Sequence, residues 1–163
     1  MAKPPKAVKT APKKENLKLI AENKKARFDY SLEDTYEAGM VLTGSEVKSL
    51  RAGQVNLKDS YVAIIRGEAF LQNAHISEYK SSSYNNHLPE RLRKLLLNQS
   101  ELNQIEEYLT ERGLSCVPTK IYFKNGRVKI EIAIAKGKKV GDKRQSIKEK
   151  DAQREMAQAK AKR

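Results

Sequence analysis

The segment around Asn125 and Gly126 constrains the fold most strongly, because it predicts a β-hairpin. Asn-Gly is the dipeptide best suited to the centre of a type I′ turn, which joins two antiparallel strands. After the turn, apolar side chains recur at every second position from Val128 to Ile134. A period of two is typical of a strand with one buried face. We therefore predict two paired strands, over residues 114–123 and 127–135.

Further short segments complete one expected domain over residues 23–136. Alternating or apolar runs predict strands over 26–34, 36–42, 61–65 and 68–74. Helices are predicted within 43–53 and over 99–112, the second from the apolar stripe of Leu102, Ile105 and Leu109. Several short strands around one core are typical of a small barrel. The expected fold class is mainly β: an oligonucleotide-binding (OB)-like closed barrel with short helices, with an open α+β sheet as the alternative.

The two ends of the chain differ from this domain in composition. Residues 1–22 are expected to form a flexible basic arm, because prolines and lysines dominate its first part. Residues 137–163 form a basic tail in which Ile147 and Met156 are almost the only apolar anchors. A helix without an apolar stripe gains little from packing. We expect the tail to be disordered when free and helical against a polyanionic surface.

The charge balance indicates the class of partner. Lysine and arginine number 33 against 20 aspartate and glutamate residues, a net charge of +13. Such a surplus favours nucleic acids, although it also promotes solubility. No apolar run approaches the ~20 residues of a membrane-spanning helix, and the basic start leads into no signal-peptide segment. One cysteine cannot form an intrachain disulfide. We expect a cytoplasmic protein that does not bind membranes.

The basic residues are concentrated rather than spread evenly, which is typical of an extended phosphate footprint. The clusters are Lys24, Lys25 and Arg27; Lys48 and Arg51; Arg91, Arg93 and Lys94; and Lys136, Lys138, Lys139, Lys143 and Arg144. A solvated surface would explain any one of them alone. Tyr84, in a polar loop, is the candidate for base stacking, with packing inside the loop as the alternative.

Motifs for catalysis are missing from the sequence. His75 and His87 lack metal-site spacing, and Cys116 lies in a predicted strand, where a small buried apolar role is expected. The acidic residues that could hold Mg²⁺ are Glu33, Asp34 and Glu37, with a solvated carboxylate cluster as the favoured interpretation. We expect no enzyme activity, metal or cofactor. Two alternatives stay open: a constitutive ribosomal or initiation-factor-like protein, and a nuclease or RNA-modifying enzyme.

Several blocks, in order, resemble the SsrA-binding protein family, also called small protein B. They are residues 23–27 (NKKAR), 36–39 (YEAG), 42–51 (LTGSEVKSLR), 56–61 (NLKDSY), 91–98 (RLRKLLLN), 136–139 (KGKK) and 142–144 (DKR). The resemblance extends from about Asn23 to Met156. One position departs from it, because many relatives carry histidine before the DKR triplet and this chain has Gly141.

The resemblance implies an OB-like barrel that binds the tRNA-like domain of transfer-messenger RNA (tmRNA, or SsrA RNA). In that family, protein and RNA enter a stalled bacterial ribosome for trans-translation, elongation factor Tu delivers the alanylated RNA, and the protein is not an enzyme. The tail would occupy the decoding centre and the empty mRNA path. With the basic clusters included, the expected RNA-binding residues are Lys24, Lys25, Arg27, Glu37, Lys48, Arg51, Arg93, Lys94, Leu96 and Asn98. The expected ribosome-binding residues of the tail are Lys136, Lys138, Lys139, Asp142, Lys143, Arg144, Lys148, Arg154 and Met156.

Overall fold

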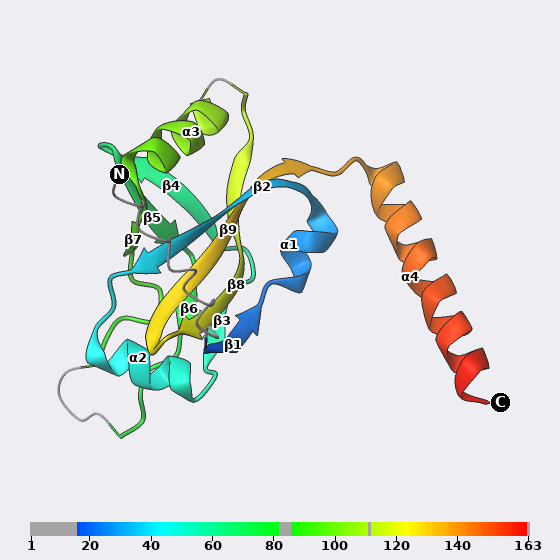
Figure 1. The fold of residues 1–163 in the computed structure, drawn as a ribbon, viewed down its shortest axis with the longest axis horizontal. Coiled ribbons are helices and arrows are strands. Elements are labelled where there is room, and N and C mark those ends of the chain that lie inside the picture. The colour runs from blue at the N-terminus through cyan, green and yellow to red at the C-terminus, as the bar shows by residue number, and fades with distance from the viewer. Residues whose placement is uncertain (1–15, 82–85, 111, 163) are drawn as a thin grey trace, which may run out of the picture.

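The computed structural model describes residues 16–81, 86–110 and 112–162. Figure 1 shows a bent sheet with short helices around it and one long helix that leads away from it. In chain order the elements are β1 (Leu17–Glu22), α1 (Lys24–Asp29), β2 (Tyr30–Met40), α2 (Gly44–Arg51), β3 (Val55–Asn56), β4 (Tyr61–Ile65), β5 (Glu68–Gln72), β6 (His75–Ile76), β7 (Arg93–Leu96), α3 (Gln99–Thr110), β8 (Ser115–Lys124), β9 (Arg127–Gly137) and α4 (Val140–Ala161).

The predicted hairpin is confirmed as β8 and β9. Lys124 pairs with Arg127 across the turn, and Asn125 and Gly126 have φ angles of 52° and 80°. Both angles lie in the left-handed region that a type I′ turn requires at its two central positions. The hairpin supplies the second and third strands of a seven-stranded sheet with the order β1-β8-β9-β2-β7-β5-β4, while β3 and β6 form a separate pair.

The sheet does not close, so the expected closed barrel is wrong. Its two end strands, β1 and β4, are not hydrogen-bonded to each other. The chain turns away from β8 at Asn23, whose side-chain amide donates to the carbonyl oxygens of Leu57 and Pro118, 3.0 Å from each. Among the described residues, no strand is hydrogen-bonded to the first part of β8 on that side, and a cavity of about 500 Å³ lies between it, α1 and β4. Closure depends on these distant contacts, which the local sequence pattern does not contain.

The N-terminal third differs from the prediction in two further ways. Residues 17–22 of the expected arm form strand β1, which pairs with β8, whereas residues 1–15 lie outside the described residues. The expected strand over 26–34 begins as helix α1, because Oδ1 of Asn23 accepts the Ala26 N–H at 3.1 Å and caps the helix. Strand β2 then continues through 36–40 in one piece, with an irregularity between Leu32 and Thr35.

The other predicted elements are close to those observed. Helix α2 begins after Thr43, whose N–H donates to Oε2 of Glu46 at 2.9 Å, and this contact fixes the first turn. Helix α3 ends at Thr110, before the expected boundary. The strands expected over 61–65 and 68–74 are β4 and β5.

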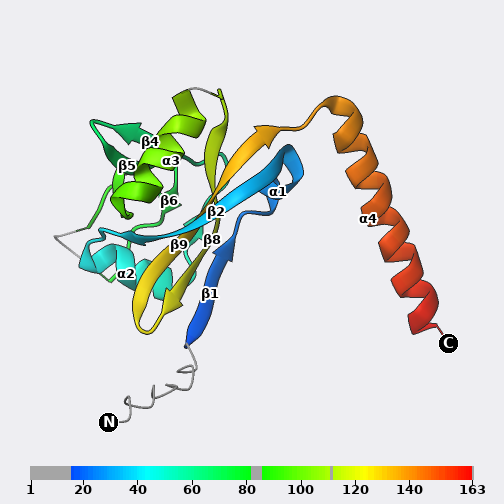
Figure 2. The ribbon, with the colours of Figure 1, turned by 45° about the horizontal axis from the view of Figure 1, so that its top comes forward.

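The main core lies inside the bend of the sheet, where residues such as Ile121, Ile130 and Ile132 are fully buried. The opposite side of β2, β7, β8, β9 and β1 is called the outer face below. Helix α1 covers one end of the outer face, where Ala26 packs on Val117 and Ala135. Figure 2 shows β1 along the hairpin and α1 next to it, and no helix of the described residues covers the hairpin end of the outer face.

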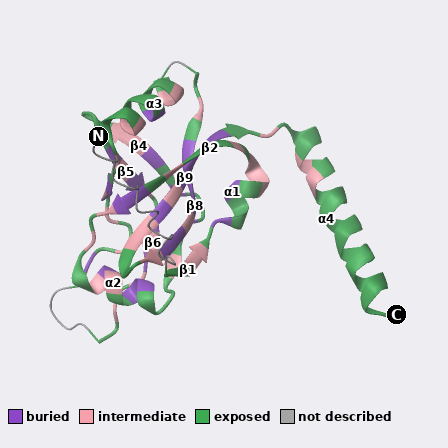
Figure 3. Cartoon of the chain, viewed as in Figure 1, coloured by how far each residue is buried: buried purple, intermediate pink, exposed green. Residues whose placement is uncertain are grey.

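Helix α4 follows β9 and has no buried residue. Figure 3 shows it exposed along most of its length, with partly buried positions only near its start. The tail is therefore able to form a helix of 22 residues, while its disorder in the free protein stays a prediction. Within the described residues, no helix is long and apolar enough to cross a membrane.

Candidate nucleic-acid interface

The register of the sheet places one row of side chains across the outer face. Leu19 pairs with Tyr122, Tyr122 with Lys129, Lys129 with Gly39, and Gly39 with Leu96. Directly paired residues point to the same side of a sheet. The row therefore crosses five strands and brings together segments that are far apart in the sequence.

Gly39 lets the row stay flat at its centre. A Cβ atom at this position would lie 3.3 Å from Cβ of Leu96 and 3.7 Å from Nζ of Lys129. Because a side chain at position 39 would press on Leu96, glycine keeps the leucine and the lysine accessible to a ligand.

An open hollow of about 560 Å³ lies next to this row. Four predicted site residues line it: Glu37, Lys94, Leu96 and Asn98. They come from β2, β7 and the start of α3. Lys129 also lines the hollow and was missed at the sequence level. The alternation in β9 could have identified it, because Lys129 lies between the apolar residues Val128 and Ile130 and must therefore face away from the core.

Glu37 is held by two donors from the neighbouring hairpin. Its carboxylate accepts hydrogen bonds from the Tyr122 hydroxyl and from Nζ of Lys124, the latter at 3.2 Å. The hydrogen bond from Tyr122 is the main cause of a lowered pKa for Glu37, and Lys124 and Lys129 add to it against the effect of partial burial. Glu37 is therefore an ionised group that positions Tyr122 and Lys124 on the outer face.

Lys94 and Leu96 both project from β7 toward solvent. Nζ of Lys94 lies 2.8 Å from Oε1 of Glu68, with 41% and 49% of the two side chains exposed. Such an exposed pair contributes little to stability, so Lys94 can exchange Glu68 for a phosphate at low cost. Leu96 is 53% exposed. Asn98 is exposed at the start of α3, where its N–H donates to Glu101.

Arg93 is not a surface residue, and its prediction as an RNA-binding residue is wrong. Its side chain is fully buried, and Nε lies 2.9 Å from Oε1 of Glu46. The guanidinium also donates to the carbonyl oxygens of Ala74 and Pro89, at 2.8 and 2.9 Å. Successive residues of a strand point to opposite sides, so Arg93 faces the interior and Lys94 the solvent.

The remaining basic clusters lie away from the hollow. Lys24, Lys25 and Arg27 are exposed on α1, and Arg27 forms an ion pair with Glu22 at 2.9 Å. Lys48 and Arg51 are exposed on α2. Figure 1 places α1 beside the tail and α2 at another end of the sheet. The structure thus does not bring these residues together with Glu37, Leu96 and Asn98.

The tail residues extend this basic surface away from the sheet. The exposed ones are Lys136, Lys139, Asp142, Arg144, Lys148, Arg154 and Met156. Lys138 and Lys143 are half-buried because they contact α1. The Lys138 N–H donates to the Asp29 carbonyl at 3.0 Å, and Nζ of Lys143 lies 3.4 Å from Oδ1 of Asp29.

Two of the residues considered for catalysis or metal binding, Cys116 and Asp34, have structural roles. Cys116 is buried as predicted, and burial raises its pKa to about 12. Asp34 accepts a hydrogen bond from Tyr108 at 2.6 Å. In the part of the chain that the structure describes, no three His, Cys, Asp or Glu side chains gather to hold a metal ion. Tyr84 lies outside the described residues.

Comparisons with known proteins agree on one family. A family model described as SmpB protein matches residues 20–162, and the chain belongs to this family. An SsrA-binding protein of Bdellovibrio bacteriovorus is 64% identical over 137 residues, covering 84% of this chain and 90% of the relative. One from a Nocardioides species is 56% identical over 147 residues, covering 90% and 92%.

A solved structure supports the same relationship. It is described as "tmRNA-SmpB: a journey to the center of the bacterial ribosome", and the match has a TM-score of 0.63 and 45% sequence identity. The match covers 74% of this chain and 85% of the solved chain. The mainly β fold with short helices is thus shared with an SmpB structure.

Proposed function

We propose that this protein binds tmRNA through the outer face and takes part in trans-translation on stalled ribosomes. The observation that carries the proposal is the open hollow next to the row on the outer face. It is lined by residues from distant segments: Glu37, Lys94, Leu96, Asn98 and Lys129. The family membership and the likeness to an SmpB chain described with tmRNA and the ribosome support the choice of RNA.

The chemistry of the hollow suits a folded RNA. Folded RNA is recognised mainly through its shape, its phosphates and its 2′-hydroxyls. Lys94 and Lys129 supply cations for phosphates, Asn98 can donate to or accept from a 2′-hydroxyl, and exposed Leu96 offers an apolar contact to a ribose. A flat row with glycine at its centre favours the backbone of a structured RNA, and the tRNA-like domain of tmRNA is the target that we propose.

The tail is proposed to act on the ribosome. Helix α4 carries basic side chains, and its apolar residues Ile147 and Met156 are both exposed rather than packed on the sheet. We therefore expect the helix to bind in an RNA-lined channel. The decoding centre and the empty mRNA path are such a channel. Ordering a segment on binding costs a few kcal/mol, so mRNA that fills the path would compete effectively with the tail. This competition would select stalled ribosomes, to which elongation factor Tu delivers the RNA–protein complex.

The direct test is binding of the purified protein to tmRNA, to its isolated tRNA-like domain and to an elongator tRNA. We expect both tmRNA forms to bind at least tenfold more tightly than the tRNA at physiological salt, a difference of about 1.4 kcal/mol. Equal affinity for all three would contradict the proposal. Sedimentation with ribosomes from cells that lack tmRNA checks the alternative of a constitutive rRNA-binding protein, which would co-sediment without tmRNA.

A further inference from the structure

Strand β1 carries two leucines on the outer face that are exposed to solvent, although contact with water is unfavourable for apolar side chains. Leu17 is 56% exposed and Leu19 57% exposed. We propose that these two side chains form an apolar contact for the riboses and base edges of the bound RNA, next to cations that bind its phosphates. The inference rests on the proposed function and adds a separate part to the same RNA-binding surface.

The register fixes the direction in which the leucines point. Leu17 pairs with Lys124, and Leu19 with Tyr122, so both leucines lie on the outer face. Lys18 pairs with Phe123, which packs partly against the main core, so the lysine points to the core side of the sheet. The observed phase packs Ile20 against the main core and leaves both leucines exposed on the outer face. A partner that covers the outer face would bury these two side chains as well.

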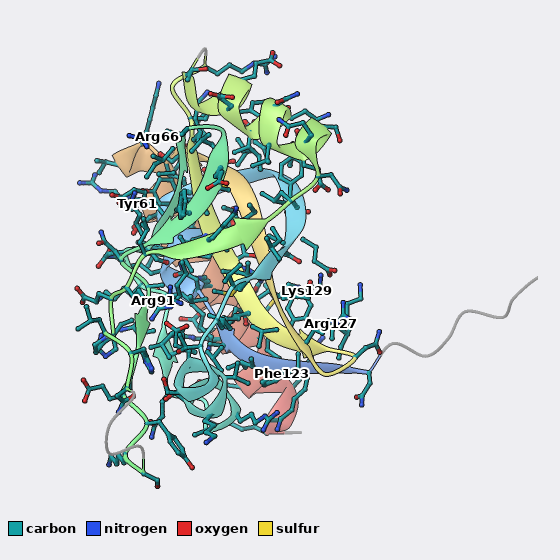
Figure 4. The ribbon with its side chains drawn as sticks, turned by 90° about the vertical axis from the view of Figure 1, so that its left-hand side faces the viewer. Tyr61, Arg66, Arg91, Phe123, Arg127 and Lys129 are labelled. Atoms are coloured by element: carbon teal, nitrogen blue, oxygen red, sulfur yellow. The ribbon has the colours of Figure 1, made fainter. Side chains whose placement is uncertain are left out.

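The neighbouring cations indicate what the partner is. Arg127 pairs with Lys124, and Lys129 pairs with Tyr122, so each leucine shares a row with a cation two strands away, at about 10 Å between backbones. Within the described residues, neither Arg127 nor Lys129 forms an ion pair with a carboxylate. Figure 4 shows both side chains on the hairpin, near its turn.

This mixture of groups fits the surface of a folded RNA. Along an RNA backbone, anionic phosphates alternate with riboses whose C–H groups are apolar. An apolar protein surface on the same patch would bury Arg127 and Lys129 without a counter-charge, which is costly. A second copy of this chain would bring further cations, because the protein has a net charge of +13. RNA satisfies both the leucines and the cations.

The test compares two leucine sites in the full-length protein. L17S/L19S removes the apolar contact on β1, and L88S removes an equally apolar side chain, 75% exposed, from the loop before β7. Binding to the tRNA-like domain of tmRNA is measured over a range of salt concentrations. We expect L17S/L19S to bind about tenfold more weakly, a change of about 1.4 kcal/mol, with an unchanged salt slope because no charge is removed. L88S should bind like the wild type.

A second pair of variants separates contact from folding. L17T/L19T introduces β-branched residues, which favour a strand, and its thermal midpoint should match that of the wild type while its affinity falls as for the serine variant. A photo-crosslinking residue at position 19 should form a crosslink to the RNA, and one at position 88 should not. Crosslinking at 19 together with weaker binding by both double variants supports the inference.

Three outcomes would overturn it. If the wild type binds tmRNA and L17S/L19S binds as tightly as L88S, the β1 contact is wrong and the proposed function stands. If the wild type shows no preference for tmRNA, both fail. If L17S/L19S changes a dimer to a monomer and leaves RNA affinity unchanged, the leucines form an interface between copies of this chain.

Discussion

Nε of Arg93 lies 2.9 Å from Oε1 of Glu46, and neither side chain has any exposed surface. The second carboxylate oxygen of Glu46 accepts from Arg91 at 2.7 Å and from the Thr43 N–H at 2.9 Å. One carboxylate thus joins the start of α2 to strand β7 and to the loop before it. Because β7 also presents Lys94 and Leu96 to the outer hollow, this ion pair supports the site from inside the protein.

Removal of Arg93 should destabilise the whole domain. In R93A, Glu46 keeps its burial but loses the buried partner, which typically costs about 3–5 kcal/mol of unfolding free energy. K94A, the matched control one residue along the strand, removes an exposed charge and should change stability by less than about 1 kcal/mol. Urea unfolding measures both. R93A within 1 kcal/mol of the wild type would show that the pair does not hold α2 on β7.

Low pH should reduce the free energy of unfolding of the protein, because the carboxylate of Glu46 becomes protonated. Burial by itself raises the pKa of Glu46, but hydrogen bonds from Arg91 and Thr43 and the charges of both arginines outweigh it, so the pKa lies below its ordinary value of 4.5. A lowered folded-state pKa stabilises the protein above the ordinary value, and this contribution is lost as pH falls through the folded-state pKa.

The variant E46Q isolates this effect. We expect it to be less stable than the wild type at neutral pH and to lose less stability as pH falls from 4.5, the ordinary pKa of the group. Urea unfolding at a series of pH values gives both curves. Parallel curves for wild type and E46Q would mean that Glu46 does not account for the acid sensitivity.

The salt dependence of RNA affinity should distinguish residues that bind phosphates through their charge from residues that make uncharged contacts. K129A removes a cation from the hollow, and the slope of log affinity against log salt should fall by about 0.7–0.9, the value for one phosphate contact. K48A should lower the slope by a similar amount if α2 also contacts phosphate, as its sequence cluster predicts. N98A removes no charge and should weaken binding with the slope unchanged. Equal slopes for the three variants would contradict this sorting of contacts.

Local signals predicted part of the fold and part of the site. The Asn125-Gly126 turn and the alternation after it depend only on neighbours in sequence, so the hairpin was predictable. Helix α1 was missed because the apolar positions Phe28, Tyr30 and Leu32 alternate as in a strand. The side chain of Asn23 caps this segment and stabilises a helix instead. Arg93 was misplaced because the run over residues 91–97 contains no clear alternation to set which side faces the core. The open edge of the sheet depends on long-range contacts of Asn23.

Helix α4 should be much less protected than the sheet in the free protein. It has no buried residue, and an isolated helix is only marginally stable in water. Its contacts with α1 include the ion pair of Lys143 with Asp29, in which 37% and 27% of the side chains are exposed. Amide hydrogen exchange should show rapid exchange over 144–161 and slow exchange in β9. Equal protection of both elements would mean that the tail is already ordered before it meets RNA.

The division of work between sheet and tail is the central claim, and one truncation tests it. A stop after Lys139 removes α4 and keeps all of β9, including the Lys138 contact with Asp29. Affinity for the tRNA-like domain and peptide tagging on stalled ribosomes are measured for the same protein. The account predicts an affinity within a few fold of the wild type and no tagging. A truncated protein that no longer binds the RNA, or that still supports tagging, would contradict it.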